Sequence, residues 1–213
     1  MQEVSDNWGE MVAAIVGDVI SSIGGPGNTA SATIIQLIKR RAEAAAKIAL
    51  EEFQQGRSLY PPDDTAAMLF RYLRAAQEGA ARINLRLMAK IMAGQNQEKP
   101  LVADDFLFWA EMIASLRREE IILLSTLLRH WYDWSSEQDQ FKRMSNASQD
   151  CQKALVPSIF AEKIELMATM AALTRTGLLV PESSFGSIVY QISPLLERLD
   201  DMASLEATLQ QES

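Results

Sequence analysis

The feature that most constrains the fold is the helical spacing of apolar residues in the first half of the chain. Apolar side chains recur every three or four positions through residues 64–93, and again through residues 29–55. Both series are rich in alanine, and small side chains allow two helices to approach closely. The sequence therefore predicts an antiparallel hairpin of two helices, the second about 30 residues long. The alanines expected at the tightest contact are Ala42, Ala45, Ala76 and Ala80.

A polar segment at residues 94–100 separates this hairpin from the rest of the chain. Such a break is typical of a boundary between regions, so we expect one region at residues 1–100 and another at residues 101–213. The first region also contains an apolar helix that ends at the Gly-Gly-Pro-Gly sequence of residues 24–27, a strong helix terminator.

The second region combines a helical pattern with one short β-hairpin. Residues 178–192 contain two apolar runs on either side of a turn at Gly186, which predicts the hairpin. Helices are expected at about residues 104–116, 117–134, 137–155 and 158–177, and from residue 194 to a frayed tail at residues 210–213. The predicted fold class is therefore all-α, mainly helical.

The turn that leads into the β-hairpin and the start of the helix after it resemble those of winged helix-turn-helix domains. The resemblance lies in residues 173–179 (Leu-Thr-Arg-Thr-Gly-Leu-Leu) and residues 190–194 (Tyr-Gln-Ile-Ser-Pro). In that family a helix ends at the glycine, two strands form the wing, and a Ser or Thr before Pro starts the next helix. The resemblance implies a winged-helix-like C-terminal region whose helix at residues 158–176 would lie in the major groove of DNA.

The residues of that helix do not suit DNA. Contacts to phosphate and guanine require Arg and Lys, and the only cations between residues 158 and 176 are Lys163 and Arg175. Its exposed face is otherwise expected to hold Ser158, Glu162, Glu165 and Thr169. We therefore favour a winged helix that packs or dimerises, with a DNA-binding transcriptional regulator as the alternative.

A broader similarity extends over about residues 64–195. Four short segments are similar to helical bacterial proteins of the Abi-alpha type, a group named for phage-resistance loci: residues 84–94, 105–106, 115–120 and 175–179. The resemblance implies a biological context, and it transfers no functional residue to this chain.

Basic residues on the predicted long helix form the clearest electrostatic feature. The chain has 20 Lys and Arg against 28 Asp and Glu, a net charge of −8, and its acidic surplus lies in residues 101–213. Five cations of the long helix, with Glu78 among them, recur every three or four residues and would form one stripe away from the apolar seam. The stripe fits an acidic partner or a nucleic-acid backbone, and the alternative is a solvated face paired with carboxylates. These candidate partner-binding residues are Arg71, Arg74, Arg82, Arg86 and Lys90.

Two acidic pairs raise a second alternative, a Mg²⁺-dependent nucleotide hydrolase. Glu162-x-x-Glu165 and Glu197-x-x-Asp200 resemble the paired carboxylates with which all-helical nucleotide pyrophosphatases hold Mg²⁺. The β-hairpin predicted between the two pairs argues against that arrangement. A di-iron site is excluded because it needs Glu three residues before each histidine, which the lone His130 lacks. We therefore expect no metal, no cofactor and no catalytic residue.

Two other features carry weaker chemical signals. Cys151 lies in a polar helix without an assignable His or Asp partner, so we do not expect a catalytic thiol. Residues 130–134 (His-Trp-Tyr-Asp-Trp) form an aromatic cluster that fits either a ligand pocket or, as is more common, the edge of a core.

Composition predicts a cytoplasmic protein. A single cysteine fits a reducing compartment, and the first 38 residues contain no Lys or Arg, which is atypical of a secretory signal. No stretch is long and apolar enough for a transmembrane helix. The apolar segment at residues 8–23 could contact a membrane surface, although Glu10 and Asp18 would be repelled by anionic lipid.

These observations together favour a non-enzymatic protein-interaction or regulatory module. The expected partner is another protein or a second copy of the chain, and the context suggested by the Abi-alpha resemblance is phage or phage defence.

Overall fold

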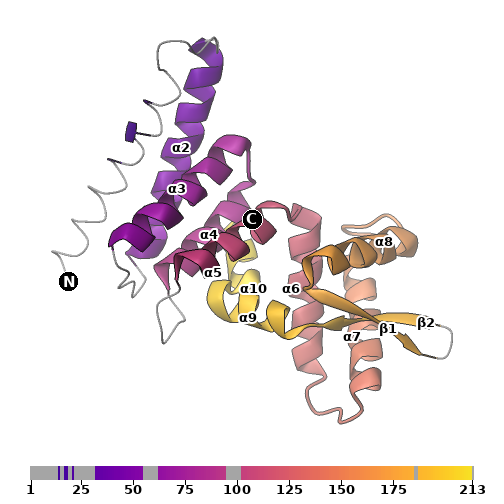
Figure 1. The fold of residues 1–213 in the computed structure, drawn as a ribbon. Helices are drawn as coiled ribbons and strands as arrows, with labels where there is room; N and C mark the ends of the chain where they lie inside the picture. Colours follow the sequence, from indigo (N-terminus) through magenta and orange to yellow (C-terminus); the bar gives the residue numbers. More distant parts are fainter. Residues whose placement is uncertain are drawn as a thin grey trace. The chain divides into compact units, whose positions relative to one another are not determined.

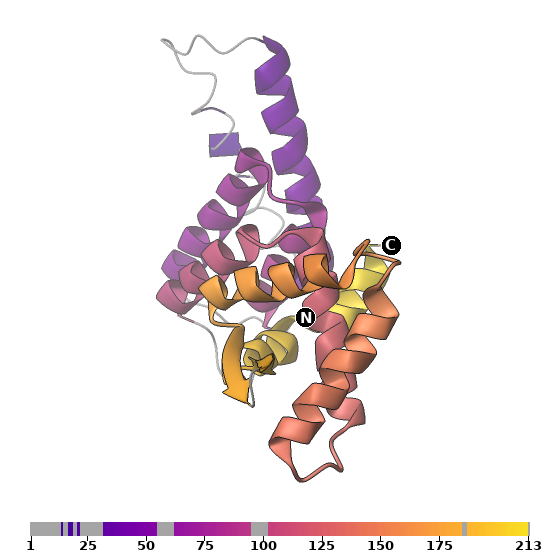
Figure 2. The same cartoon turned by 90° about the vertical axis from the view of Figure 1, so that its right-hand side faces the viewer.

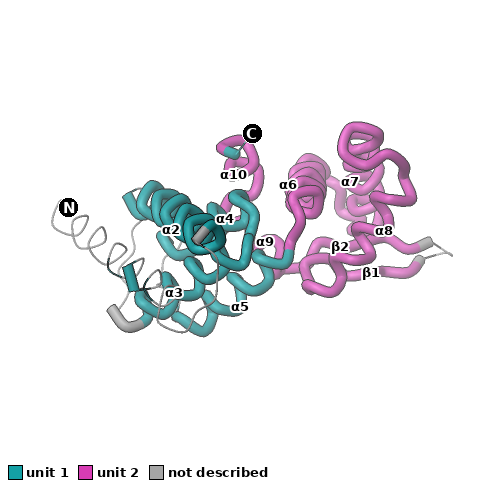
Figure 3. The backbone as a smooth tube through the Cα atoms, turned by 90° about the horizontal axis from the view of Figure 1, so that it is seen from above, with its two compact units in different colours: residues 1–115, 212 teal, residues 116–211, 213 magenta. Residues whose placement is uncertain are grey.

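The computed structural model describes residues 14, 17, 18, 21, 32–54, 62–94, 102–184 and 187–212. The chain divides into two compact units, which Figure 3 shows in different colours. Unit 1 comprises residues 1–115 with Glu212, and unit 2 comprises residues 116–211 with residue 213. The apolar helix expected before residue 24, with its membrane contact at residues 8–23, lies outside the described residues except for isolated positions.

The predicted fold class is confirmed. Within the described ranges the chain forms nine α-helices, labelled α2 to α10, one short 3₁₀ helix and a single two-stranded antiparallel sheet (Figure 1). None of the helices described is both long and apolar enough to span a lipid bilayer.

Unit 1 contains α2 (Ala32–Phe53), α3 (Pro62–Glu78), α4 (Arg82–Ala93) and α5 (Ala103–Ala114), and α2 packs against both α3 and α4. Three of the alanines expected at the close contact, Ala42, Ala45 and Ala76, are buried, whereas Ala80 is partly exposed. The hydroxyl of buried Tyr72 in α3 donates a hydrogen bond of 2.8 Å to the Ala45 carbonyl, so the contact has a polar link as well.

The single long helix predicted for residues 64–93 is wrong, because the chain breaks between α3 and α4. Gly79 has φ +99°, a left-handed conformation that ends α3, and Ala81 is extended before α4 begins. A Cβ atom at Gly79 would lie 3.3 Å from Nη1 of Arg41, so a side chain there would also crowd α2. The break changes the direction of the chain and lets α2 contact two shorter helices.

Helix α5 belongs to unit 1, whereas its residues were expected to lie in the second region. It packs against α3 and α4, and it buries Phe106, Trp109 and Ile113 on one face. The Asn84 side chain of α4 donates a hydrogen bond to the Ile113 carbonyl near the end of α5. The compact units therefore divide after Ser115, later than the predicted boundary at residue 100.

Unit 2 begins with α6 (Arg118–Asp133) and α7 (Gln140–Leu155), which lie side by side (Figures 1 and 2). Asp139 caps α7, because its carboxylate accepts hydrogen bonds from the N–H groups of residues 141 and 142. Helix α8 (Lys163–Leu173) begins later than the predicted residue 158, and a short 3₁₀ helix, η1 (Thr174–Thr176), follows it. The Glu165 carboxylate accepts from the Ala161 N–H, which holds the segment before α8 in a turn.

The predicted β-hairpin forms from β1 (Leu179–Ser184) and β2 (Ser187–Ile192), with Leu179 opposite Ile192. Helix α9 (Pro194–Ala203) follows directly, and the Ser193 hydroxyl caps it by accepting a hydrogen bond from the Leu196 N–H. A further helix, α10 (Leu205–Gln211), occupies part of the tail that was expected to fray. The order of unit 2 is thus three helices, a hairpin and two helices.

Candidate functional site

The five cations of the predicted basic stripe do not form one exposed surface. Arg71 and Arg74 lie on α3, and both pair with Glu78, at 3.8 and 2.9 Å. The other three lie on α4, beyond the break at Gly79, and two of these, Arg86 and Lys90, are buried. The stripe was wrong because its spacing assumed one continuous helix.

Arg86 instead occupies the centre of a buried ionic cluster in unit 1. Its guanidinium donates to Glu52 at 2.7 Å, to Glu51 at 3.1 Å and to Glu212, which unit 1 includes. Arg82 also pairs with Glu212, at 2.6 Å. Carboxylates of the chain therefore occupy the Arg86 side chain, which is not available to an acidic partner.

Burial governs the ionisation of the groups around this cluster. Burial lowers the pKa of Lys90, and the nearby Arg86 charge lowers it further, against the opposing effect of Glu52. Burial likewise raises the pKa of Tyr72, whose hydroxyl already donates to Ala45. Both effects favour the neutral forms, which is typical of a structural interior.

The aromatic cluster at residues 130–134 joins α6 to α7. The Arg143 guanidinium lies 3.6 Å from the centre of the Trp131 ring and donates two hydrogen bonds to the Trp131 carbonyl. The Trp134 indole donates to Asp150 at 3.0 Å, and His130 lies 3.2 Å from Asp133. These contacts make the cluster part of helix packing, as the core-edge interpretation anticipated.

Within the described residues, the acidic pairs do not come together as a metal site, and Cys151 does not form a thiol site. Among them, no group of three or more His, Cys, Asp or Glu side chains is placed to hold a metal ion. Glu165 and Asp200 each accept a local backbone N–H. Cys151 is fully buried, and burial raises the pKa of its thiol to about 12, against a lowering by Arg129.

Arg175, one of the two cations expected to face DNA, is held by an internal partner. Its guanidinium donates to both carboxylate oxygens of Glu120, at 2.9 and 3.2 Å, and Glu120 also accepts from the Arg117 N–H at the start of α6. Burial alone would raise the pKa of Glu120, but these hydrogen bonds outweigh it and the net pKa is lowered. Arg175 therefore ties η1 to the first turn of α6.

Part of the surface of α8 that faces away from the core is apolar. Leu166, Thr169, Met170 and Leu173 are buried, so Thr169 does not belong to the exposed face that the sequence predicted. The opposite side carries what we call the α8 outer face: Ile164, which is 71% exposed, with Ala168 and Ala171 at the following turns.

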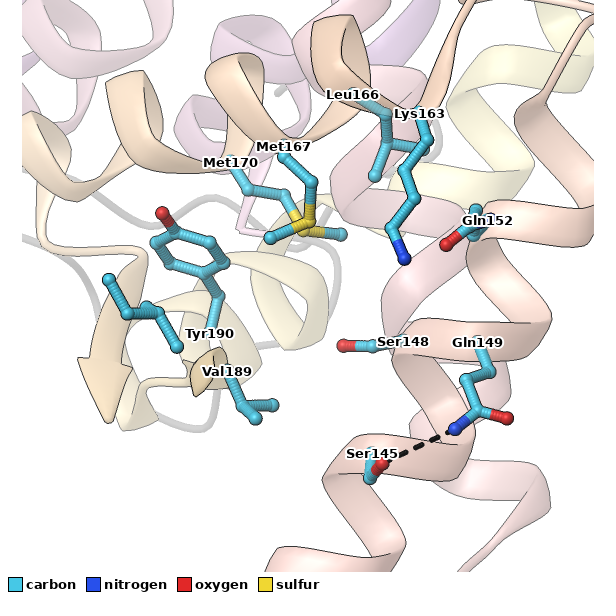
Figure 4. A pocket seen from close by; sticks show the side chains of 11 residues that line it. Ser145, Ser148, Gln149, Gln152, Lys163, Leu166, Met167, Met170, Val189 and Tyr190 are labelled. Carbon is cyan, nitrogen blue, oxygen red and sulfur yellow. Dashed lines mark hydrogen bonds between the residues drawn. The ribbon is translucent and has the colours of Figure 1, made fainter. Parts of the chain in front are cut away.

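A pocket of about 190 Å³ lies between α7, α8 and β2, within unit 2 (Figure 4). Helix α7 contributes a polar wall: Ser145, Ser148, Gln149 and Gln152. Helix α8 contributes Lys163, Leu166, Met167 and Met170, and the strand contributes Ile188, Val189 and Tyr190. This pocket was not predicted from the sequence, although the uncharged polar residues of α7 recur at helical spacing, which indicates a polar face without ion pairs.

No protein-family model, no curated protein and no solved structure matches the chain.

Proposed function

We propose that the chain is a non-enzymatic interaction module that associates with a second copy of itself through the α8 outer face. The observation that carries the proposal is Ile164, a large apolar side chain that is 71% exposed on the side of α8 opposite the core. Because exposing it to water is unfavourable, a surface that covers it gains hydrophobic free energy.

The distribution of side-chain sizes along the face supports a second copy as the partner. The N-terminal end of α8 carries the bulky Ile164, and the C-terminal end carries the small Ala171 and Ala172. If two copies of α8 lie antiparallel with Ala168 at the two-fold axis, each Ile164 meets the alanines of the other copy. A two-fold contact requires this kind of self-complementary surface.

The length of α8 limits the size of this contact. Because α8 has only 11 residues, the contact is small, and we expect a weak dimer whose population depends on concentration.

The winged-helix interpretation is compatible with this proposal. The residues of α8 favour self-association over DNA binding. The order α6, α7, α8, β1, β2 and α9 resembles that of a winged helix, in which α8 would enter the major groove. Its outer face, however, presents Ile164 and alanines where phosphate and base contacts require cations. Arg175 is held by Glu120, and unit 2 has 9 basic against 13 acidic residues.

Sedimentation velocity of the full chain across micromolar concentrations tests the proposal. The wild type is expected to shift from monomer toward dimer as concentration rises. Ala168→Arg places two bulky cations at the two-fold axis and should weaken the dimer by about tenfold or more, equivalent to about 1.4 kcal/mol. Ile164→Asp should have a similar effect because it buries a charge in the apolar contact.

The matched control is Ala154→Arg, which makes the same change at an exposed position of α7, away from the α8 outer face. It should leave the dimer unchanged. A wild-type chain that stays monomeric throughout, or an Ala168→Arg variant that dimerises as the wild type does, would overturn the proposal. Salt-sensitive binding of duplex DNA that Lys163→Glu abolishes would favour the regulator instead.

A further inference from the structure

We infer that the pocket between α7, α8 and β2 binds a small organic monoanion with an apolar body, such as an aryl-substituted or alkyl carboxylate. The inference concerns a ligand rather than a partner chain, and it does not depend on self-association through the α8 outer face. All the residues that line the pocket belong to unit 2.

The charge of the pocket selects an anion. Lys163 is the one charged side chain among the described residues that line it, and no ion pair is found for Lys163 within the described part of the chain. Figure 4 shows its side chain directed into the pocket, between Met167 and Gln152, with its amino group toward Ser148. A cation placed in this way attracts a negatively charged group.

The polar wall can complete the recognition of a carboxylate. Ser148 and Gln152 lie on the same side of α7 as Ser145 and Gln149, where the Gln149 amide donates to the Ser145 hydroxyl at 3.5 Å. Hydroxyl and amide groups donate hydrogen bonds to carboxylate oxygens without adding charge. Lys163 balances the negative charge of the carboxylate, and the hydroxyl and amide groups fix its orientation.

The opposite wall fits an apolar body. Met167 and Met170 of α8 and the Tyr190 ring of β2 lie together on that side of the pocket (Figure 4). Thioethers adapt to the shape of a ligand and make favourable contacts with aromatic rings. A ligand that is apolar at one end and anionic at the other therefore contacts complementary groups along its whole length.

Charge and size narrow the class of ligand further. One lysine balances one negative charge, whereas a phosphate group, which carries more charge, is usually held by several cations. The volume of about 190 Å³ is on the scale of a small carboxylate.

Methyl NMR of the full chain with ¹³C-labelled methionine tests the inference, with 3-phenylpropionate and hexanoate as probes. The Met167 and Met170 methyl resonances, assigned with Met167→Leu and Met170→Leu variants, should shift saturably, with dissociation constants in the millimolar range expected for such small ligands. Lys163→Gln should weaken binding of both probes by about tenfold, because it removes the charge-assisted contact.

Two controls distinguish recognition of the carboxylate charge from nonspecific hydrophobic binding. Lys153→Gln removes an exposed lysine that pairs with Asp150 outside the pocket, and it should leave the affinity unchanged. The neutral 3-phenylpropanamide should bind wild-type protein about as weakly as 3-phenylpropionate binds Lys163→Gln. Absence of saturable shifts with both anionic probes, or equal affinities of wild type and Lys163→Gln, would overturn the inference.

Discussion

Arg86 of α4 and Glu52 of α2 form an ion pair of 2.7 Å in which the two side chains are only 8% and 1% exposed. Glu51 and Glu212 add further carboxylates. Burial alone would lower the pKa of Arg86, but the hydrogen bonds that its guanidinium donates to all three carboxylates outweigh burial, and the pKa is raised. Removing charges from water is costly, and this pair persists because each partner satisfies the other. It sets the position of α2 along α4 within unit 1.

Arg86→Met is expected to lower the free energy of unfolding by about 3–5 kcal/mol, because it removes the guanidinium that pairs with the buried Glu52 carboxylate. Urea denaturation followed by circular dichroism measures the loss. A double variant, Arg86→Met with Glu52→Leu, should recover a large part of it, since it removes the buried charge together with its partner.

The matched control for that experiment is Arg74→Met. Arg74 pairs with Glu78 at 2.9 Å, but both side chains are exposed, so its loss should cost no more than about 1 kcal/mol. Equal effects of the two single variants would show that burial of the Arg86 cluster contributes little to stability.

Glu120→Gln tests the contact between α6 and η1. The ordinary pKa of this carboxyl is 4.5, and its folded pKa is lower. Its stabilising effect is therefore complete above pH 4.5 and is lost as the pH falls through the folded pKa. We expect the variant to be less stable by about 1–3 kcal/mol at neutral pH, since a buried charged hydrogen bond is removed. The difference from wild type should shrink under acidic conditions, as measured by urea denaturation at a series of pH values.

Glu119→Gln provides the comparison for Glu120→Gln, because Glu119 is the preceding residue of the same first turn and is exposed. It should change stability by no more than about 0.5 kcal/mol at neutral pH. A Glu120→Gln variant whose deficit stays constant down to acidic pH would contradict the role assigned to the ionised carboxylate.

The fold class and most elements of unit 2 could be predicted from local signals. Three signals that each involve only a few residues lie where expected: the start of α9 at Ser193-Pro194, the end of η1 at Gly177, and the alternating pattern of the two strands. The break at Gly79 was missed because the apolar spacing continues across it, and a single glycine in a helical pattern is often tolerated. Its left-handed conformation depends on the packing of α3 and α4 against α2, which spacing alone does not encode.

Of the candidate functional features, only those that depend on a single helix could be predicted from the sequence. The apolar side of residues 163–173 is visible in the sequence, but whether Thr169 faces in or out depends on the other elements of unit 2. The burial of Arg86 likewise depends on Glu52, which lies 34 residues earlier. The pocket combines residues of α7, α8 and β2, so no local pattern contains it.

The last prediction concerns the Cys151 thiol, which is fully buried and has its pKa raised to about 12 from an ordinary value of 9.0. Because the thiolate is the reactive form, labelling by Ellman's reagent in native buffer should be at least about tenfold slower than for a model thiol, even before access is considered. Urea should restore a fast, stoichiometric reaction in parallel with unfolding, because unfolding removes the burial that raises the pKa. A buried thiol with a raised pKa cannot react rapidly. Rapid labelling of the native chain would therefore mean that α7 opens readily and exposes Cys151.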